Sequence, residues 1–396
     1  MKKNIAILIP DLRDGGTERF VSNLSFSLSE EKYEKYIVLF DVEGIDYPFQ
    51  GNLINLNTKA INNPLGKVYN VIKRIYRLKK VKKKYNIQIT LSFLETANII
   101  NMFAQAEDKV IISIRNFKST SLKGFYGKLY KFIMKLFYNN NVDKIIAVSK
   151  EVKKDLIKNY GIKENKIKVI YNLYDLEKIQ KFAGEKIEDN YEELFNYPVI
   201  VNVGRLTKQK AQWHLIRAFK KVKEKITNMK LIILGRGELK DYLYQLVSEL
   251  NLEKDVYFLG FQKNPFKFIS KSKIYVFPSL YEGFPNALVE AMACGIPVIS
   301  SDCKSGPREI LAPETDSKIE TSTIEYAKYG VLIPVCDNIY YNARYPLTTE
   351  ERTLAKSIID LYSSKEFLDN YACKAKERAM DFNKDKIILE YENILK

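Results

Sequence analysis

The chain alternates short apolar runs with amphipathic segments along most of its length, and this alternation limits the folds open to it. In the first half, the runs that predict strands are Ile5–Ile9, Tyr36–Phe40, Ile87–Phe93, Lys109–Ile114, Lys144–Val148 and Lys168–Ile170. Helical periodicity lies between them, over Thr17–Ser29, Val68–Lys84 and Lys123–Tyr138. Strand–helix alternation at this spacing predicts a parallel sheet with helices on both faces.

The second half repeats the pattern. Strands are predicted at Val199–Val203, Lys230–Leu234, Val256–Gly260, Ile274–Val276, Val298–Ser300 and Gly330–Pro334. Helices are predicted at Gln212–Glu224, Leu239–Leu250, Pro265–Ser270 and Asn286–Ala293, and two or three more over Thr349–Leu395. With 396 residues the chain exceeds one ordinary hydrophobic core.

We therefore expect an α/β fold of two Rossmann-like, doubly wound domains in tandem. The first domain is predicted at residues 1–175 and the second at 198–378. The polar, acidic stretch 176–197 is interpreted as a linker, and 379–396 as a final helix that packs back on the first domain. Ligands of such folds bind beyond the carboxyl ends of the strands, so the expected site is a cleft between the two domains.

The stretch Tyr281–Ser301 predicts a loop, a short helix and a buried strand. Pro285 suits the first position of a helix, and Gly295 suits the left-handed residue that ends one. Glu282 then lies in the loop and Glu290 near the middle of the helix. Two glutamates beside a helix N-terminus indicate a site that holds hydroxyls on one side and phosphate on the other.

A cationic loop, Gly204–Lys210, follows a predicted strand and precedes a predicted helix. Backbone N–H groups and the helix dipole already favour an anion at such a place. Arg205 offers a fork of donors and Lys210 a point charge, which together match the oxygens of a diphosphate. A solvated basic loop is the alternative interpretation, and this motif alone leaves both open.

Several other chemistries find little support in the residues. Gly235-x-Gly237 lacks the third glycine of a dinucleotide fingerprint, there is no P-loop, and no D-x-D pair occurs. The single histidine, His214, follows Trp213 on a predicted helix and is expected to serve helix packing. The four cysteines form no C-x-x-C pair and suggest buried residues of a reducing compartment. We expect no cofactor and no metal.

The net charge of +16 is concentrated in the first half. Residues 1–170 carry 31 Lys and Arg against 16 Asp and Glu, whereas the remainder carries 33 against 32. This asymmetry predicts an anionic partner for the first half. A nucleic-acid-binding protein is an alternative class, but it leaves the phosphate-site motifs of the neutral half unexplained, and we expect no nucleic acid partner.

Much of this basic charge lies on two amphipathic segments, Lys67–Lys84, which holds nine Lys and Arg, and Lys118–Tyr138. Basic amphipathic helices bind anionic bilayers, so we favour a membrane surface over a packed helix with a solvated basic face. The apolar run at the N-terminus is too short for a signal peptide, and no run reaches a membrane span. The expected location is cytoplasmic and peripheral, on the inner face of the cell membrane.

The sequences E-G-F-P-N-A-L-V-E-A-M-A-C-G-I-P-V-I-S, G-R-L-T-K-Q-K and D-L-R-D-G-G-T-E-R together resemble the retaining, nucleotide-sugar-dependent glycosyltransferases of the GT-B architecture, with their Glu-x7-Glu signature. Ser113–Asn116 and Ser305–Glu309 are similar to bacterial enzymes that transfer galactose or N-acetylgalactosamine to lipid-linked or capsular glycans. The resemblance implies transfer of a hexose or N-acetylhexosamine from a UDP-sugar to a polyprenyl-diphosphate-linked or growing glycan, with retained configuration and without metal. A sugar-nucleotide epimerase or a phosphorylase of the same fold is the alternative.

The resemblance also implies roles for individual residues. Glu290 would hold the ribose hydroxyls, Glu282 a hydroxyl of the donor sugar, and Arg205 and Lys210 the leaving diphosphate. The implied nucleotide-sugar contacts are Gly15, Gly16, Gly204, Arg205, Lys210, Gly235, Gly260, Phe261, Glu282, Gly283, Phe284, Pro285, Asn286 and Glu290.

The first domain would supply the acceptor side, through Asp11 and the pair Arg115 and Asn116. Many relatives place a histidine where Arg115-Asn116 stands, so one of these two, or the backbone, would contact the primary hydroxyl of the sugar. For Glu95 a role on the acceptor side and a plain surface position are both open.

Overall fold

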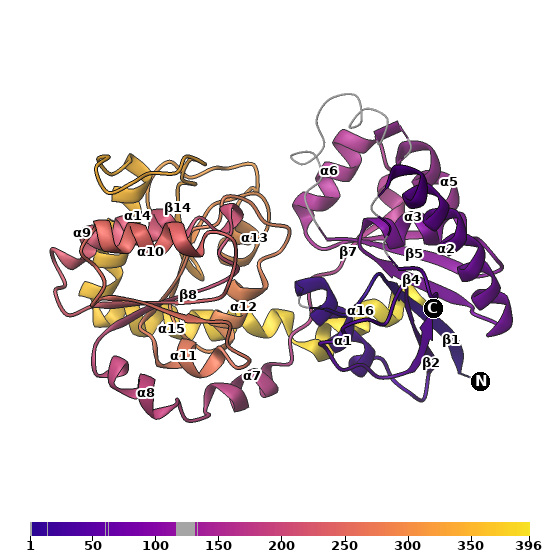
Figure 1. The fold of residues 1–396 in the computed structure, drawn as a ribbon, viewed down its shortest axis with the longest axis horizontal. Coiled ribbons are helices and arrows are strands. Elements are labelled where there is room, and N and C mark those ends of the chain that lie inside the picture. Colours follow the sequence, from indigo (N-terminus) through magenta and orange to yellow (C-terminus); the bar gives the residue numbers. More distant parts are fainter. Residues whose placement is uncertain (1, 14, 60, 62, 116–130, 133) are drawn as a thin grey trace. The chain divides into compact units, whose positions relative to one another are not determined.

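The computed structural model describes residues 2–13, 15–59, 61, 63–115, 131–132 and 134–396. The chain divides into two compact units. Residues 1–174 and 384–396 form the N-terminal unit, and residues 175–383 form the C-terminal unit. Within the described residues each unit is built on one seven-stranded sheet (Figure 1).

The sheet of the N-terminal unit is parallel throughout, in the order β3-β2-β1-β4-β5-β6-β7. Its strands are β1 (Lys3–Ile9), β2 (Tyr33–Leu39), β3 (Asn52–Asn55), β4 (Ile89–Phe93), β5 (Lys109–Ile114), β6 (Lys144–Ala147) and β7 (Ile167–Val169). The chain runs outward from β1 in one direction and then from β4 in the other. The boundary between β1 and β4 is therefore the switch point of this sheet.

Helices cover both faces of this sheet. They are α1 (Gly16–Ser27), α2 (Pro64–Lys84), α3 (Glu95–Phe103), α5 (Asn139–Asn141), α6 (Lys150–Tyr160) and α16 (Lys384–Leu395), with the short turns η1 (Met134–Tyr138) and η2 (Glu164–Lys166). The alternation of β1 side chains separates two cores, as expected for a strand. Ile5, Ile7 and Ile9 pack with α1 and α16, whereas Ala6 and Leu8 pack with α2 and α3. The sheet lies between these two pairs of helices (Figure 1).

The sheet of the C-terminal unit has the order β10-β9-β8-β11-β12-β14-β13. Its strands are β8 (Val199–Val203), β9 (Lys230–Leu234), β10 (Val256–Gly260), β11 (Ile274–Phe277), β12 (Val298–Ser301), β13 (Glu325–Ala327) and β14 (Gly330–Ile333). All pairs are parallel except β13 with β14 at the edge. The switch point lies between β8 and β11.

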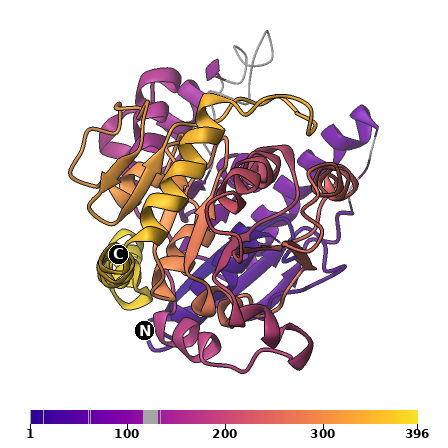
Figure 2. The same cartoon turned by 90° about the vertical axis from the view of Figure 1, so that its left-hand side faces the viewer.

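The helices of this unit form two layers, with the strands of its sheet between them (Figures 1 and 2). One layer holds α9, α10 and α14, and α11, α12 and α15 lie on the other side (Figure 1). The bounds are α7 (Leu176–Ala183), α8 (Asp189–Glu192), α9 (Gln212–Lys223), α10 (Lys240–Glu249), α11 (Phe266–Lys271), α12 (Asn286–Ala293), α13 (Pro307–Leu311), α14 (Thr349–Ser363) and α15 (Lys365–Ala379), with η3 (Glu193–Asn196), η4 (Lys208–Lys210) and η5 (Met380–Phe382).

The structure confirms the predicted fold class and differs from the sequence interpretation in several elements. The edge strands β3 and β13 are additional, and both are short. Helix α2 begins at Pro64, four residues before the predicted start, because the Asn63 side chain caps it by accepting from the N–H of Gly66. Pro285 precedes α12 rather than opening it.

The stretch interpreted as a linker, 176–197, is largely helical and belongs to the C-terminal unit. Asp175 caps α7, which buries Leu176 and Ile179. Phe182 of the same helix stacks on Phe266 of α11, with ring centroids 6.5 Å apart. The two turns of α7 bury enough apolar side chains to pack on a neighbouring helix, but they are too short to show a clear helical periodicity of apolar residues in the sequence. The chain passes between the units at 174–175 and again at 383–384.

Within the described residues, no helix combines the length and apolar character needed to cross a membrane. Most of the second basic segment, Lys118–Tyr138, lies outside the described residues, as does Asn116.

Candidate active site

The site is formed where the strand order of the C-terminal sheet reverses. The loop after β8 carries Gly204–Lys210, and the loop after β11 carries Glu282. Because β8 and β11 are parallel neighbours, their carboxyl ends lie side by side and both loops leave from the same edge. The two predicted motifs, about 70 residues apart in sequence, are thereby brought together.

Lys210 and Glu282 form an ion pair across this switch point. The Lys210 Nζ lies 2.6 Å from Glu282 Oε1, and the two side chains are 17% and 9% exposed. The same ammonium lies 4.9 Å from the centroid of the Phe277 ring, at the end of β11. A half-buried cation against an aromatic face and a carboxylate is a fixed positive charge, able to stabilise negative charge on a bound group.

The Glu282 carboxylate also shapes the electrostatics of the strand ends. Burial raises the pKa of the Tyr275 phenol, and the negative charge of Glu282 adds to this rise. The pKa of the Cys303 thiol is raised in the same way, by burial first and by Glu282 second. Both groups therefore stay neutral, and Cys303 is not a nucleophile.

Hydrogen bonds connect the loop after β8 with the loop after β11. The N–H of Leu280 donates to the carbonyl of Gln209 at 2.9 Å, and the Gln209 side chain donates to the carbonyl of Tyr281 at 2.8 Å. The N–H of Glu282 donates to Lys304 O at 2.8 Å. These contacts fix the positions of Lys210 and Glu282 relative to each other without a ligand.

Glycines allow the neighbouring loops to approach this pair. Gly235, with φ at +147°, lies so close to the β8 loop that a Cβ would stand 2.0 Å from Gly204 O. Its N–H donates to Gly260 O at 2.8 Å. The predicted contacts Gly204, Gly235 and Gly260 thus line the carboxyl ends of the adjacent strands β8, β9 and β10.

The remaining predicted residues of the C-terminal unit lie in the segments that follow β8, β10 and β11. Glu290 is buried in the middle of α12, and Phe284 is buried in the loop before it. Gly283 accepts from the Ser305 hydroxyl at 2.6 Å, which ties this loop to the one after β12. Arg205 is exposed in the β8 loop, and the exposed Phe261 ring lies 5.1 Å from the Arg236 guanidinium carbon. Pro285 and Asn286 form the junction between the loop and α12.

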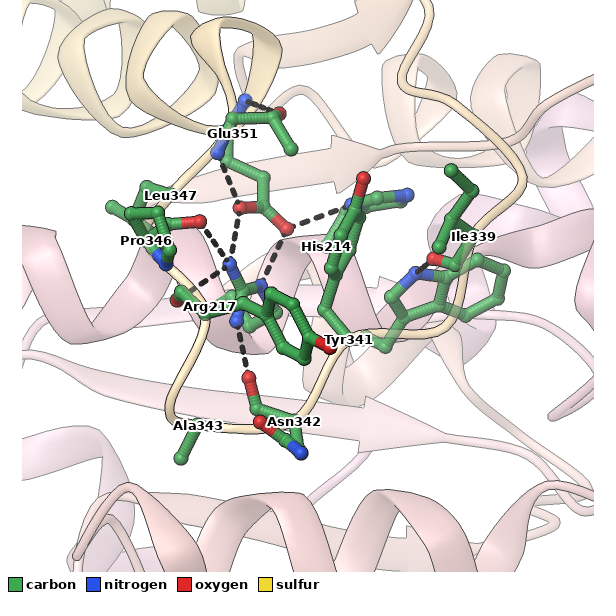
Figure 3. Close-up of polar contacts among 12 residues, drawn as sticks. His214, Arg217, Ile339, Tyr341, Asn342, Ala343, Pro346, Leu347 and Glu351 are labelled. Atoms are coloured by element: carbon green, nitrogen blue, oxygen red, sulfur yellow. Dashed lines mark hydrogen bonds and ion pairs between the residues drawn. The ribbon is translucent and has the colours of Figure 1, made fainter.

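A buried polar network fixes the helix that follows Lys210 (Figure 3). On α9, His214 Nδ1 lies 2.8 Å from Glu351 Oε1, and Arg217 Nε donates to the same oxygen at 2.7 Å. Arg217 also donates to the carbonyls of Asn342 and Pro346, at 2.6 and 2.8 Å. His214 is buried in helix packing, as predicted from the sequence.

Through this network, α9 holds the long loop 334–347 against Lys208 of the cationic loop. Trp213 Nε1 donates to Ile339 O at 2.9 Å. The next residue, Tyr340, packs on Trp213 with ring centroids 4.9 Å apart. Its ring centroid also lies 5.3 Å from the Lys208 ammonium. Lys208–Lys210 is therefore contacted from two sides.

In the N-terminal unit, the predicted residues gather at the switch point between β1 and β4. Gly15 precedes α1 and Gly16 opens it, and the Asp11 carboxylate pairs with Arg13 at 2.7 Å. A Cβ on Gly15 would lie 2.0 Å from Glu18 Oε2, so the Glu18 carboxylate folds back over the N-terminus of α1. Burial raises the pKa of Glu18 although backbone N–H groups donate to it, and the charge of Asp11 adds to the rise.

Arg115, at the end of β5, is engaged in the packing of this unit. Its guanidinium carbon lies 3.9 Å from the Phe20 ring centroid and 5.9 Å from that of Phe93. It also donates to Asn172 Oδ1. Burial lowers the pKa of the guanidinium. The predicted sugar contact through Arg115 therefore requires a side chain that already has aromatic and amide partners.

Sequence reasoning named both members of the central pair but not the contacts that support them. Gln209 and Ser305 lie inside motifs but had no role assigned to them, and Phe277 carries no motif. The sequence signal for Glu18 is an acid in the first turn of a helix that begins with glycine. Within the described residues, no three His, Cys, Asp or Glu side chains are grouped to hold a metal ion.

The fold and the site together define a two-domain protein of the GT-B architecture, with a cationic loop at the switch point of its second sheet. Two family models match: Glycosyltransferase Family 4 over residues 14–178, and Glycosyl transferases group 1 over residues 184–325.

Two named relatives match this chain over most of their length. The chain is 38% identical over 357 residues to an uncharacterized glycosyltransferase of Methanocaldococcus jannaschii, covering 87% of each protein. It is 32% identical over 394 residues to the N-acetylgalactosamine-N,N'-diacetylbacillosaminyl-diphospho-undecaprenol 4-alpha-N-acetylgalactosaminyltransferase of Campylobacter jejuni, covering 97% of each. The crystal structure of Anabaena HepE in complex with UDP is similar in fold, with a TM-score of 0.76, 19% identity, and coverage of 100% of this chain and 99% of HepE. The chain belongs to the group 1 glycosyltransferases.

Proposed function

We propose that this protein transfers a hexose or N-acetylhexosamine from a UDP-sugar to a lipid-linked or growing glycan, with retention of configuration. The observation that carries the proposal is the Lys210–Glu282 pair at the switch point of the C-terminal sheet. The similarity to a Campylobacter jejuni enzyme whose name specifies a diphospho-undecaprenol acceptor supports the acceptor class. The similarity in fold to HepE, whose structure contains UDP, supports the donor class.

The donor diphosphate would lie at the Gly204–Lys210 loop. There Lys210 would exchange its Glu282 partner for phosphate oxygens, and the exposed Arg205 would add a second cation. Glu282, released from Lys210, would accept a hydrogen bond from a sugar hydroxyl. Glu290, on the neighbouring helix α12, would accept from the ribose hydroxyls. Within the N-terminal unit, Gly15 and Gly16 would offer their backbone N–H groups to an anion only after Glu18 withdraws from the start of α1.

In the reaction, the acceptor oxygen forms a bond to the anomeric carbon on the same face from which the leaving group departs. The bond from that carbon to the diphosphate oxygen breaks, and its electron pair stays on the diphosphate. The acceptor hydroxyl proton passes to the departing oxygen. Lys210 and Arg205 stabilise the charge that develops there without a metal ion. No enzyme nucleophile is assigned.

We place the reaction at the inner face of the cell membrane. A lipid-linked acceptor is confined to the bilayer, and the cytoplasmic leaflet is the anionic one. The +15 charge of residues 1–170 supports this location.

The test is a transfer assay with the purified chain, a panel of UDP-hexoses and UDP-N-acetylhexosamines, and a polyprenyl-diphosphate-linked sugar. We expect UDP release that depends on the acceptor, and a product enlarged by one sugar. Lys210→Met should lower kcat by about 10²–10³-fold, the usual cost of a lost donor at a developing anion. Lys221→Met, on the exposed side of α9, is the matched control and should transfer normally.

UDP release or interconversion of the donor sugar without acceptor would favour an epimerase and contradict the proposal. Normal transfer by Lys210→Met would show that the site is elsewhere. The stereochemistry of the product, read by NMR of the new glycosidic linkage, tests retention separately.

A further inference from the structure

One surface of the N-terminal unit is unusually apolar for an exposed helix. Leu65, Val68, Tyr69, Ile72 and Tyr76 of α2 are each between 59% and 84% exposed. Their spacing of three, four and seven residues places all five on one face of the helix. We call these five residues the α2 stripe. Single exposed apolar residues are ordinary, but a contiguous row marks an interaction surface.

The α2 stripe is not a core face that failed to pack, because the opposite face of α2 is firmly docked. Leu78 is fully buried against the sheet. Lys82 and Asp108 form an ion pair at 2.8 Å with both side chains completely buried. Arg74 donates to the Thr58 hydroxyl at 2.9 Å. The helix is therefore held rigidly with its stripe directed outward.

The charge on this helix identifies the partner. Residues 64–84 contain no Asp or Glu, whereas 67–84 contain nine Lys and Arg. Lys79, Lys80 and Lys83 are exposed and continue the line of the stripe toward the C-terminal end of α2. The Lys80 ammonium lies 4.6 Å from the Tyr76 ring centroid, as in a side chain whose stem lies along an apolar surface.

We propose that the α2 stripe inserts into an anionic bilayer, with the first three turns of α2 at the acyl boundary and Lys79, Lys80 and Lys83 among the lipid headgroups. Apolar insertion next to clustered cations is the pattern of interfacial helices. A second copy of the chain is a poor occupant, because it would bring two acid-free, highly cationic helices into contact. The inference deepens the proposed function and rests on it, since a lipid-linked acceptor is the reason to reach a bilayer.

The test is co-sedimentation of the full chain with vesicles of phosphatidylcholine alone or mixed with phosphatidylglycerol. We expect binding that requires phosphatidylglycerol. Lys79→Gln with Lys83→Gln should weaken it about fivefold for each lysine and reduce its dependence on salt. Lys221→Gln with Lys225→Gln removes the same charge from the C-terminal unit and should bind as wild type.

The apolar half of the α2 stripe is tested independently of charge. Leu65→Ser with Ile72→Ser should weaken binding at least about tenfold, since each inserted methylene contributes to transfer from water. Phe26→Ser with Leu389→Ser, exposed positions on α1 and α16, is the control and should bind normally. A Tyr69→Trp variant should show a blue shift of its emission with phosphatidylglycerol vesicles, against the constant signal of the buried Trp213.

Wild-type binding by the stripe variants, or binding that ignores phosphatidylglycerol, would overturn the proposal. So would a stripe variant that changes from dimer to monomer in sedimentation while vesicle binding is unchanged, because the occupant would then be a second copy. Transfer to a short-chain, water-soluble acceptor should be normal in every stripe variant. If wild type binds vesicles but transfers to no acceptor, the proposed function fails and the membrane surface stands.

Discussion

Breaking the Lys210–Glu282 pair provides a quantitative test of the site, because the cost depends on burial. Lys210→Met leaves the Glu282 carboxylate 9% exposed and without its ammonium partner at 2.6 Å. Removing one member of a buried pair costs about 3–5 kcal/mol, and partial exposure of Lys210 places this case near about 3 kcal/mol. In a unit of this size, each kcal/mol lowers Tm by about 2–4 °C, so a drop of about 6–12 °C is expected.

The double-mutant cycle tests whether the two residues act together. Lys210→Met with Glu282→Gln should cost less than the sum of the two single changes, because no buried charge is left alone. The matched pair is Lys221–Glu224, at 2.5 Å but 48% and 51% exposed, whose removal should cost at most about 1 kcal/mol. Thermal unfolding monitored by circular dichroism gives the change in stability for each of these variants. Additive costs for Lys210 and Glu282 would refute the reasoning, as would equal costs for the buried and exposed pairs.

Further predictions concern the loops, the buried network and the chemistry. Gly235→Ala should weaken UDP binding in calorimetry, because a Cβ there would meet Gly204 O at 2.0 Å, whereas Gly184→Ala, with its nearest atom at 3.5 Å, should bind normally. Glu351→Gln should destabilise the C-terminal unit by about 3–5 kcal/mol in denaturant unfolding, since it leaves Arg217 and His214 without their buried carboxylate. Burial alone would raise the pKa of Glu351, but hydrogen bonds from His214, Arg217 and Thr348 outweigh burial and lower that pKa below the usual 4.5. The ionised Glu351 therefore stabilises the fold above about pH 4.5, and this stabilisation is lost as the pH falls. Acid unfolding of Glu351→Gln should accordingly depend less steeply on pH below about pH 4.5 than that of the wild type. Treatment with EDTA should leave transfer unchanged, and loss of activity restored by a divalent cation would contradict the metal-free mechanism.

Much of the fold could be predicted because hydrophobic periodicity is a local property. Strands such as Lys109–Ile114 and Val199–Val203 have the predicted bounds, since each is a largely apolar run that is buried on both faces. β3 escaped prediction because Asn52–Asn55 holds only two apolar residues at an exposed edge. α7 escaped it because eight residues between polar stretches give too little period to recognise.

The sequence indicated individual residues of the candidate site but not which of them contact each other. The motifs pointed to Lys210 and Glu282 separately, and only the adjacency of β8 and β11 makes them partners. The contacts of His214 and Arg217 with Glu351 join positions more than 130 residues apart, which no local pattern reveals. The resemblance predicts Arg115 as a sugar contact, but its stacking on Phe20 depends on how α1 packs on the sheet.

The most direct test of the central claim is calorimetric titration of UDP into the wild-type chain and into Glu290→Gln. We expect saturable binding by wild type, and affinity at least about tenfold weaker, or about 1.4 kcal/mol, when the buried carboxylate of α12 is neutralised. Equal affinity in the two proteins would contradict it, because the nucleotide would then bind outside the site at the β8–β11 switch point.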